Sequence, residues 1–205
     1  ICAQAQRLRV DLDRRDYIAA HVLLREALSA CGPMAPAEWS FVRTEAGQPL
    51  VVETQAGTPP LAFSLTHTRG LVACAVVRGR AVGVDAEGVR PVPGAQHIAD
   101  TRLAPSEAAM LASHDPTDVD TRFLELWTLK EAYSKALGLG LRLPLDAHAF
   151  AFTGTDGLAF RGGDDDRSWA FWLAQVPPRY RLALAVRAPS GEPPRVTFQD
   201  VDARH

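Results

Sequence analysis

The sequence predicts an α+β fold in two similar-sized lobes, and three observations support this prediction. Each half of the chain begins with a segment of helical periodicity and continues with short apolar runs separated by turn signals. The length of 205 residues suits one large domain or two small ones that share a core. The composition, 47% hydrophobic and 22% charged, is that of a globular protein. We expect an N-terminal lobe over residues 1–82 and a C-terminal lobe over residues 83–205.

The first half opens with an amphipathic helix. Apolar side chains recur at helical spacing in DRRDYIAAHVLLREALSACGP, and Gly32-Pro33 should end the helix. β-branched and apolar stretches follow, broken by turn signals. The Arg78-Gly79-Arg80 turn is expected to join two antiparallel strands, 71–77 and 81–86.

The second half contains the strongest helix signal in the sequence. The Pro/Gly-rich stretch EGVRPVPGAQHIADT is expected to be a connecting loop. Pro105 and an acidic first turn then predict a short helix in APSEAAMLASHD. A long helix follows in DVDTRFLELWTLKEAYSKALG, which Gly138 should end. Four later stretches alternate with turns and predict one antiparallel sheet: 149–152, 158–161, 169–175 and 181–187.

Charge and cysteine content limit the classes of function. The formal net charge is −2, so no basic surplus indicates a general nucleic-acid binder, and phosphate recognition must be local. The apolar runs are too short to span a bilayer. The three cysteines lie far apart and show no zinc-ligand spacing, which favours reduced thiols. We therefore expect a cytoplasmic protein that acts on neither nucleic acid nor membranes.

The first candidate site is the pair of carboxylates in GVDAE, Asp85 and Glu87. On an extended strand, residues i and i+2 point to the same face. Two adjacent carboxylates repel each other, and a cation relieves that repulsion. The alternative is that both residues are solvated where a strand enters a loop.

The second candidate site lies in WTLKEAYSKALG. Glu131 and Lys135 are four residues apart, so they share one face of the predicted helix, and Trp127 lies one turn before them. The alternative is an exposed ion pair that contributes about 0.2–0.5 kcal/mol to helix stability.

Two further groups could bind phosphate. His67 stands between two threonines after an apolar run, and the hydroxyls and backbone N–H groups of this turn could assist it. Arg14 and Arg15 belong to a basic cluster before the first helix, and their planar guanidinium groups suit phosphate. In both cases a solvated surface is the alternative.

The order of these motifs resembles the Sfp-type 4′-phosphopantetheinyl transferase family. LTHTRG and AVGVDAE, followed some forty residues later by LWTLKEAYSKALGLGL, are similar to the family's motifs in the same order. DRRDYIAAHVLLREAL resembles its first helix and RTEAGQPLV its Gly-Lys-Pro stretch, although Gln48 replaces the lysine. The resemblance implies a pseudo-dimeric α+β fold, each lobe an antiparallel sheet packed with helices, with coenzyme A in the cleft between lobes.

The resemblance also implies a reaction. The family transfers 4′-phosphopantetheine from coenzyme A to a serine of an acyl or peptidyl carrier protein, and it releases adenosine 3′,5′-bisphosphate. The carrier would serve fatty-acid, polyketide or non-ribosomal peptide synthesis. The length, about twice that of the small trimeric members of the superfamily, implies a monomer.

The resemblance further implies roles for individual residues, when each motif of this chain is matched to the corresponding motif of the family. Asp85, Glu87 and Glu131 would hold Mg²⁺ on the diphosphate of coenzyme A. Since a serine hydroxyl must lose its proton, Glu131 is our candidate for the catalytic base. Lys135, one turn further on, would stabilise or protonate the departing phosphate.

The remaining roles concern the phosphates of coenzyme A. His67, with Thr66, would bind the 3′-phosphate. Lys130 and Lys135 would contact the phosphates, and Arg14 and Arg15 are further phosphate partners. Two other interpretations stay open: a non-catalytic module that binds coenzyme A or a nucleotide, and an interaction protein that binds neither.

Overall fold

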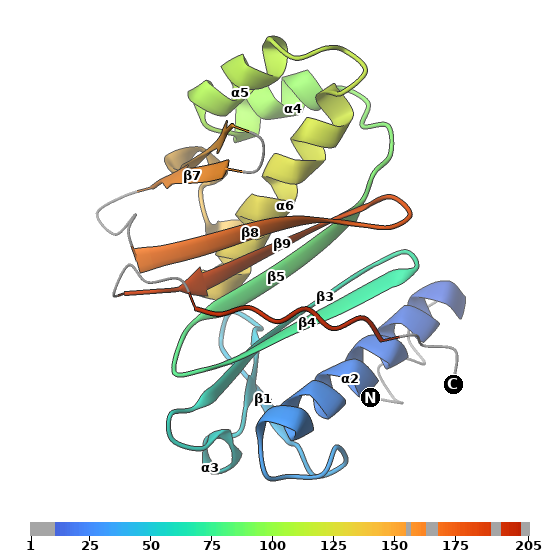
Figure 1. Ribbon diagram of the computed structural model, residues 1–205, viewed down its shortest axis with the longest axis vertical. Coiled ribbons are helices and arrows are strands. Elements are labelled where there is room, and N and C mark those ends of the chain that lie inside the picture. Colours follow the sequence, from blue (N-terminus) through green and yellow to red (C-terminus); the bar gives the residue numbers. More distant parts are fainter. Residues whose placement is uncertain (1–10, 155–156, 163–167, 190–193, 202–205) are drawn as a thin grey trace.

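The computed structural model describes residues 11–154, 157–162, 168–189 and 194–201 (Figure 1). The elements of the first half are α2 (Asp11–Cys31), β1 (Phe41–Arg43), β2 (Pro49–Val51), α3 (Glu53–Ala56), β3 (Leu61–Thr68) and β4 (Leu71–Arg78). Those of the second half are β5 (Val82–Gly88), α4 (Ala95–Arg102), α5 (Pro105–Ala112), α6 (Val119–Leu137), η1 (Gly140–Arg142), η2 (Leu145–Ala147), β6 (Ala149–Thr153), β7 (Gly157–Arg161), β8 (Trp169–Val176) and β9 (Tyr180–Arg187).

In the first lobe, α2 lies along the antiparallel hairpin of β3 and β4 (Figure 1). The apolar stripe of α2, with Leu24 and Leu28, packs against Trp39 and against the odd-numbered side chains of β3, including Phe63. Alternate side chains of a strand point to opposite faces. The even-numbered side chains of β3 therefore face away from α2, toward the second lobe.

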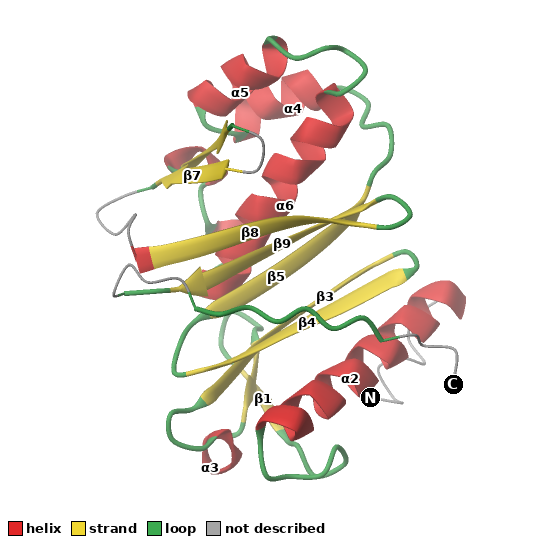
Figure 2. Ribbon diagram, viewed as in Figure 1, coloured by secondary structure: helices red, strands yellow, loops and turns green. Residues whose placement is uncertain are grey.

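In the second lobe, α6 packs against the sheet of β5, β9 and β8, and α4 and α5 pack against α6 (Figure 2). The core of this lobe contains Leu126 and Leu129 from α6 and Ala183 and Ala185 from β9. Gly138 ends α6 in the left-handed conformation, with φ of +70°, as its position in the sequence predicted.

Strand β5 joins the two lobes because both of its faces are covered. Val82 and Val84 pack against the β3–β4 hairpin in a core that also takes in Val196 of the C-terminal segment. The opposite face carries Gly83, where an added Cβ would lie 1.9 Å from the carbonyl oxygen of Ala132 in α6. Glycine at this position lets the helix approach the strand closely enough to align their charged side chains.

Three sequence expectations about the fold were wrong. Strands β4 and β5 do not pair with each other, since β4 pairs with β3 and β5 with β9. Instead of joining the hairpin edge to edge, β5 packs across it, and the Ser64 hydroxyl accepts a hydrogen bond from the Val84 N–H at 3.0 Å. The stretch expected to be a loop contains α4, whose buried Ala95 and Ala99 are one helical turn apart. The four C-terminal strands belong to two sheets, not one.

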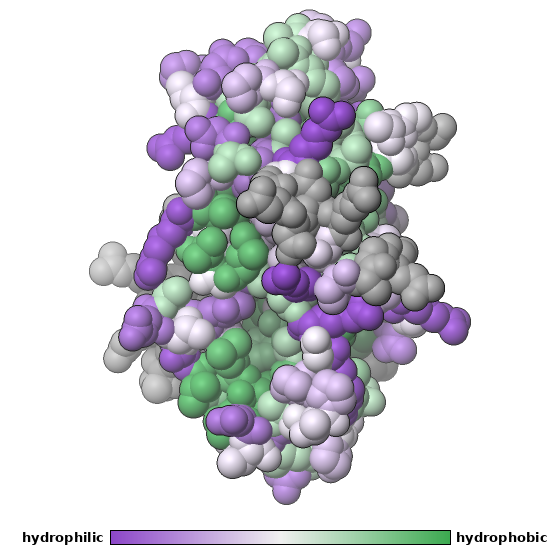
Figure 3. Space-filling model, turned by 90° about the vertical axis from the view of Figure 1, so that its left-hand side faces the viewer, coloured by the Kyte–Doolittle hydropathy of each residue, from purple (hydrophilic) through white to green (hydrophobic). Residues whose placement is uncertain are grey.

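The α+β class, with antiparallel strands and helices in each half, is confirmed. The boundary at residues 82/83 stays a prediction. None of the helices in the described part of the chain is long and apolar enough to cross a bilayer. On the face shown in Figure 3, hydrophilic groups divide the apolar surface into separate patches, as is usual for a globular domain.

Candidate active site

A row of charged side chains, which we name the charged row, lies where α6 crosses β5. It consists of Asp85 and Glu87 from the strand and of Glu131 and Lys135 from the helix. The face of β5 that carries Gly83 also carries Asp85 and Glu87, since these residues alternate along the strand. From α6, the Nζ of Lys135 donates a hydrogen bond to Oδ1 of Asp85 at 2.6 Å. The two partners are 50 residues apart in sequence, and only 7% of Asp85 is exposed. The close approach at Gly83 thus brings the predicted carboxylate and lysine together.

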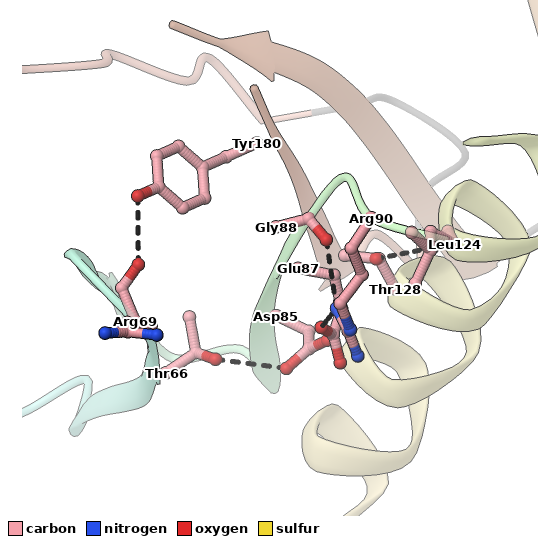
Figure 4. A network of polar contacts seen from close by, with 9 residues as sticks. All are labelled: Thr66, Arg69, Asp85, Glu87, Gly88, Arg90, Leu124, Thr128 and Tyr180. Atoms are coloured by element: carbon pink, nitrogen blue, oxygen red, sulfur yellow. Dashed lines mark hydrogen bonds and ion pairs between the residues drawn. The ribbon is translucent and has the colours of Figure 1, made fainter. Parts of the chain in front are cut away.

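The first lobe also reaches Asp85. The Thr66 hydroxyl of β3 donates a hydrogen bond to Oδ1 of Asp85 at 3.0 Å (Figure 4). Thr66 is buried and belongs to the even-numbered face of β3, the face that meets β5. Asp85 is therefore fixed by donors from both lobes.

Glu87 lies at the more open end of the same row. Arg90 donates hydrogen bonds to Oε2 of Glu87 at 2.8 Å and to the Gly88 carbonyl at 2.9 Å (Figure 4). Arg181, which pairs with Glu87 across β5 and β9, instead donates to the Glu125 carboxylate at 2.7 Å. Glu87 is thus held by a single exposed cation.

The third predicted acidic residue, Glu131, shares this electrostatic environment. Burial raises the pKa of Glu131, the negative charges of Asp85 and Glu87 raise it further, and Lys135 opposes the shift. Within the described residues, no hydrogen bond engages its carboxylate. The structure therefore brings Asp85, Glu87, Glu131 and Lys135 into one region.

The carboxylates of the charged row suit a metal ion that is partly coordinated by substrate phosphate. They do not form a site in which protein side chains alone surround the ion. Among the described residues, no three His, Cys, Asp or Glu side chains are arranged to hold a metal ion. Asp85 and Glu87 instead pair with Lys135 and Arg90. Mg²⁺, however, usually binds through one or two carboxylates together with substrate phosphate oxygens and water. The assignment of these carboxylates to Mg²⁺ stays a prediction.

Lys130 is not at this site, which corrects the expectation that it contacts phosphates. Its side chain is fully buried and pairs with Glu107 of α5 at 2.8 Å. It also donates to the carbonyl oxygens of Leu145 and His148, each at 2.6 Å. The three protons of the ammonium group therefore have partners inside the lobe. Since neighbouring residues of a helix differ by about 100° in direction, Lys130 points into the lobe while Glu131 faces the strand.

The structure separates Thr66 from His67, which the sequence had grouped. Thr66 points to Asp85, whereas His67 is exposed on the opposite face of β3. Burial first, and then neighbouring positive groups that include Arg25, Arg43 and, last, His67, lower the pKa of His21 in α2. The period of two residues along a strand explains the separation.

The predicted arginines lie at the start of α2. Arg15 is exposed and, within the described residues, forms no ion pair or hydrogen bond with the charged row. The backbone of Arg14 belongs to α2, but its side chain lies outside what the structure describes. The start of α2 does approach the β3–β4 turn, where the Gly70 N–H donates to Asp16 at 3.4 Å.

Two pockets flank the charged row. The first, of about 260 Å³, we name the Lys135 pocket; it is lined by Lys135, Gln48, Pro49, Phe63, Leu65 and Gly138, among others. The second, of about 350 Å³, we name the arginine pocket; its lining includes Arg69, Arg90, Arg179, Glu87, Thr68 and Tyr180. Along β3, Ser64 lines the first pocket and Thr68 the second. At 3.3 Å per residue, the two pockets are about 13 Å apart, and Thr66 with Asp85 lies between them.

Sequence reasoning missed several residues of these pockets. Gln48, noted only as a departure from the family lysine, donates a hydrogen bond to the Lys135 carbonyl at 3.0 Å and so ties the β1–β2 hairpin to α6. Arg179 and Tyr180 follow a Pro-Pro turn that reads as an ordinary strand connection. No local pattern shows that this turn meets the turn at Arg69, 110 residues away, because only the packing of the lobes brings them together.

Comparison with known proteins identifies the family. A family model for the 4′-phosphopantetheinyl transferase superfamily matches residues 81–185, just over half of the chain, and this span contains β5 and α6. A phosphopantetheinyl transferase of Thraustochytrium sp. is 28% identical over 96% of this chain and 73% of its own length. The 4′-phosphopantetheinyl transferase HetI of Nostoc sp. is 32% identical over 68% of this chain and 58% of its own length.

A third relative connects the chain with the Sfp group. The 4′-phosphopantetheinyl transferase Sfp of Bacillus subtilis is 24% identical over 86% of this chain and 76% of its own length. These matches agree with the order of motifs and with the charged row at the junction of β5 and α6. The chain therefore belongs to the Sfp-type 4′-phosphopantetheinyl transferases, and it is a transferase enzyme.

Proposed function

We propose that the protein transfers the 4′-phosphopantetheine group from coenzyme A to a serine hydroxyl of an acyl or peptidyl carrier protein. The observation that carries this proposal is the row of Asp85, Glu131 and Lys135 at the junction of two lobes, between two pockets. A diphosphate donor and a protein acceptor that react at one centre need charged groups in the middle and space on both sides. The family membership supports the same reaction class.

The proposed reaction is a phosphoryl-type transfer in which positions and charges matter more than covalent chemistry. The serine oxygen forms a bond to the phosphorus that carries pantetheine. The bond from this phosphorus to the bridging oxygen breaks, and adenosine 3′,5′-bisphosphate leaves with the electron pair. Glu131 accepts the serine proton at its carboxylate, which no other described residue engages by a hydrogen bond.

Lys135 supplies positive charge where negative charge develops. Its side chain is 30% exposed, and among the described residues its Nζ donates to Asp85 and to the Val84 carbonyl, at 2.6 and 3.2 Å. A lysine at the edge of a pocket can turn its flexible side chain to a phosphate oxygen. Such a preorganised cation stabilises the departing phosphate.

Asp85, Glu87 and Glu131 are the residues that we propose to hold Mg²⁺, and Thr66 positions Asp85 for this purpose. When bound, the ion would neutralise the charge of the diphosphate. The donor chemistry supports this assignment, since these carboxylates are close enough to raise the proton affinity of Glu131.

We also propose which residues bind the nucleotide end of coenzyme A, and in which oligomeric state and compartment the enzyme acts. His67, Arg14 and Arg15 belong to β3 and α2 of the first lobe, and they remain our candidates for the 3′-phosphate. We further propose a monomeric cytoplasmic enzyme that acts on neither nucleic acid nor membranes, for which the net charge of −2 is suitable.

A loading assay tests the function. The protein, coenzyme A and Mg²⁺ are incubated with a panel of carrier proteins, and intact mass spectrometry should detect the added phosphopantetheine. Glu131→Gln should slow loading by about 10²-fold or more, the usual contribution of a general base. Glu26→Gln, on the exposed face of α2, is the matched control and should load at the wild-type rate.

The same assay separates the alternatives. A module that only binds coenzyme A would show a rise in melting temperature with coenzyme A but no gain of mass by any carrier. A protein that binds neither would show no shift. Unreduced loading by Glu131→Gln would remove the base assignment while leaving the reaction itself intact.

A further inference from the structure

Three arginines from three connecting segments line the arginine pocket. Arg69 belongs to the turn between β3 and β4, Arg90 follows β5, and Arg179 belongs to the turn between β8 and β9. All three side chains are exposed. Glu87, the last acidic residue of the charged row, lines the same pocket. The pocket is thus a basic surface that opens directly beside the proposed reaction centre.

The segments that carry these arginines are linked by hydrogen bonds. The Tyr180 hydroxyl donates a hydrogen bond to the Arg69 carbonyl at 2.9 Å, which links the two lobes (Figure 4). Gly70, with φ of +83°, leaves room for this contact, because a Cβ there would lie 2.9 Å from the tyrosine oxygen. The Val89 N–H donates to the Arg179 carbonyl at 2.8 Å. These two hydrogen bonds therefore hold the segments that carry Arg69, Arg90 and Arg179 next to one another.

The pocket carries an excess of positive charge. Within the described residues, its one internal ion pair joins Arg90 to Glu87 at 2.8 Å, and Arg69 and Arg179 take part in no salt bridge. Since the chain as a whole has a formal charge of −2, this excess is a local feature. A basic patch of this kind attracts an anionic partner and speeds its association.

We propose that the arginine pocket receives an acidic segment of the acceptor protein, next to its acceptor serine. This assignment rests on the proposed transfer reaction, and it identifies the surface by which the enzyme selects its acceptor. A carboxylate-bearing segment docked on Arg69 and Arg179 would bring a neighbouring serine to the Glu87 end of the charged row.

Charge and position favour the acceptor protein over coenzyme A as the occupant. The Lys135 pocket already offers the donor a cation together with apolar walls from Phe63, Leu65 and Pro49, which suit a nucleotide base. The three arginines, by contrast, are exposed around an open rim, where charges mainly steer a protein partner and fix its orientation.

Charge reversal tests the assignment. Arg69→Glu/Arg179→Glu should raise the KM for the carrier protein by about tenfold or more and remove much of its dependence on salt, while kcat and the KM for coenzyme A stay within about twofold. The neutral variant Arg69→Gln/Arg179→Gln should give a smaller increase. Arg102→Glu/Arg161→Glu, which reverses two exposed charges elsewhere, should leave all three constants unchanged.

A reciprocal change in the partner sharpens the test. A carrier in which lysine replaces the acidic residues beside the acceptor serine should be loaded poorly by the wild-type enzyme and better by Arg69→Glu/Arg179→Glu. Recovery of this kind would support direct contact, because a merely structural effect of the two substitutions would not depend on the charge of the carrier.

Other outcomes would overturn the assignment. If the double variant raised the KM for coenzyme A but left the KM for the carrier unchanged, the pocket would instead bind the donor. If that rise were absent with 3′-dephospho-coenzyme A, the bound group would be the 3′-phosphate. Unchanged constants for both substrates would mean that these arginines have no part in recognition. Wild-type protein that loads no carrier would refute the proposed function together with its acceptor surface.

Discussion

Two lysines of α6 form ion pairs of similar length in different surroundings. Lys130 lies 2.8 Å from Glu107, and neither side chain is exposed. Lys135 lies 2.6 Å from Asp85, and 30% of its side chain is exposed. The first pair lies inside the second lobe, whereas the second lies at the edge of a pocket.

The two sites differ in whether a ligand can reach the lysine, and not in the length of the ion pair. Lys130 has three acceptors, and burial lowers its pKa while Glu107 opposes the shift. Glu107 also accepts hydrogen bonds from the Ala104 and Phe150 N–H groups, so the pair fastens α5 and β6 to α6. Lys135 can exchange its partner for a ligand, but Lys130 cannot without exposing a buried carboxylate.

The largest expected effect is on stability and comes from breaking the buried pair. Lys130→Met leaves the Glu107 carboxylate buried without its cation, and the free energy of unfolding should fall by about 3–5 kcal/mol. Urea denaturation followed by circular dichroism measures this loss. Lys130→Met/Glu107→Leu should recover part of it, since no buried charge then remains. A single variant as stable as the wild type would contradict the structural role of the pair.

The next effect concerns His148, which accepts a hydrogen bond from Lys130 at its backbone carbonyl. Burial, and then the charge of Lys130, lowers the pKa of the His148 ring to about 4, and its Nε2 has no hydrogen-bond partner among the described residues. Because the folded-state pKa lies below the unfolded value of 6.5, the unfolded chain binds the extra proton first as the pH falls.

Stability should therefore fall between about pH 6.5 and pH 4 by about 3 kcal/mol through this group. Urea denaturation at a series of pH values measures the change. His148→Phe should be less sensitive to acid than the wild type by this amount, whereas His97→Phe, at an exposed position of α4, should match the wild type. Equal acid sensitivity of all three proteins would exclude His148 as the cause.

The smallest effect on stability is expected at the accessible pair, where the effect on activity is large. Lys135→Met should lower the free energy of unfolding by about 1–2 kcal/mol, less than Lys130→Met, because Lys135 is partly exposed and Thr66 still donates to the buried Asp85. Carrier loading should fall by about 10²–10³-fold, the usual loss when one preorganised donor to a developing charge is removed. A variant that loads normally, or one that loses as much stability as Lys130→Met, would remove the contrast between the two lysines.

The main elements of the site were predictable from local patterns. The long helix and its end at Gly138 follow from periodicity and from the residue that the left-handed conformation favours. The shared face of Asp85 and Glu87 follows from the alternation of a strand, and that of Glu131 and Lys135 from the helical repeat. These features depend on residues within one or two turns of each other, so the sequence alone indicates them.

The sequence did not indicate which side of α6 faces the strand. Lys130 and Lys135 both fit a phosphate-binding motif, and burial alone separates them. In the same way, the pairing of β5 with β9 and the helix α4 depended on which apolar faces met in the folded lobe. Local propensity carries no information about these contacts, because they join segments far apart in the chain.

The sequence by itself determined the family, the motifs and the residue types available for chemistry. Only the tertiary structure decided that Thr66 and Lys135 meet on one oxygen of Asp85, and that two distant turns bring Arg69 and Arg179 to the pocket that Glu87 lines. The physical reason is that side-chain direction follows from short-range backbone geometry, whereas the partners that a side chain meets follow from the packing of two lobes across β5.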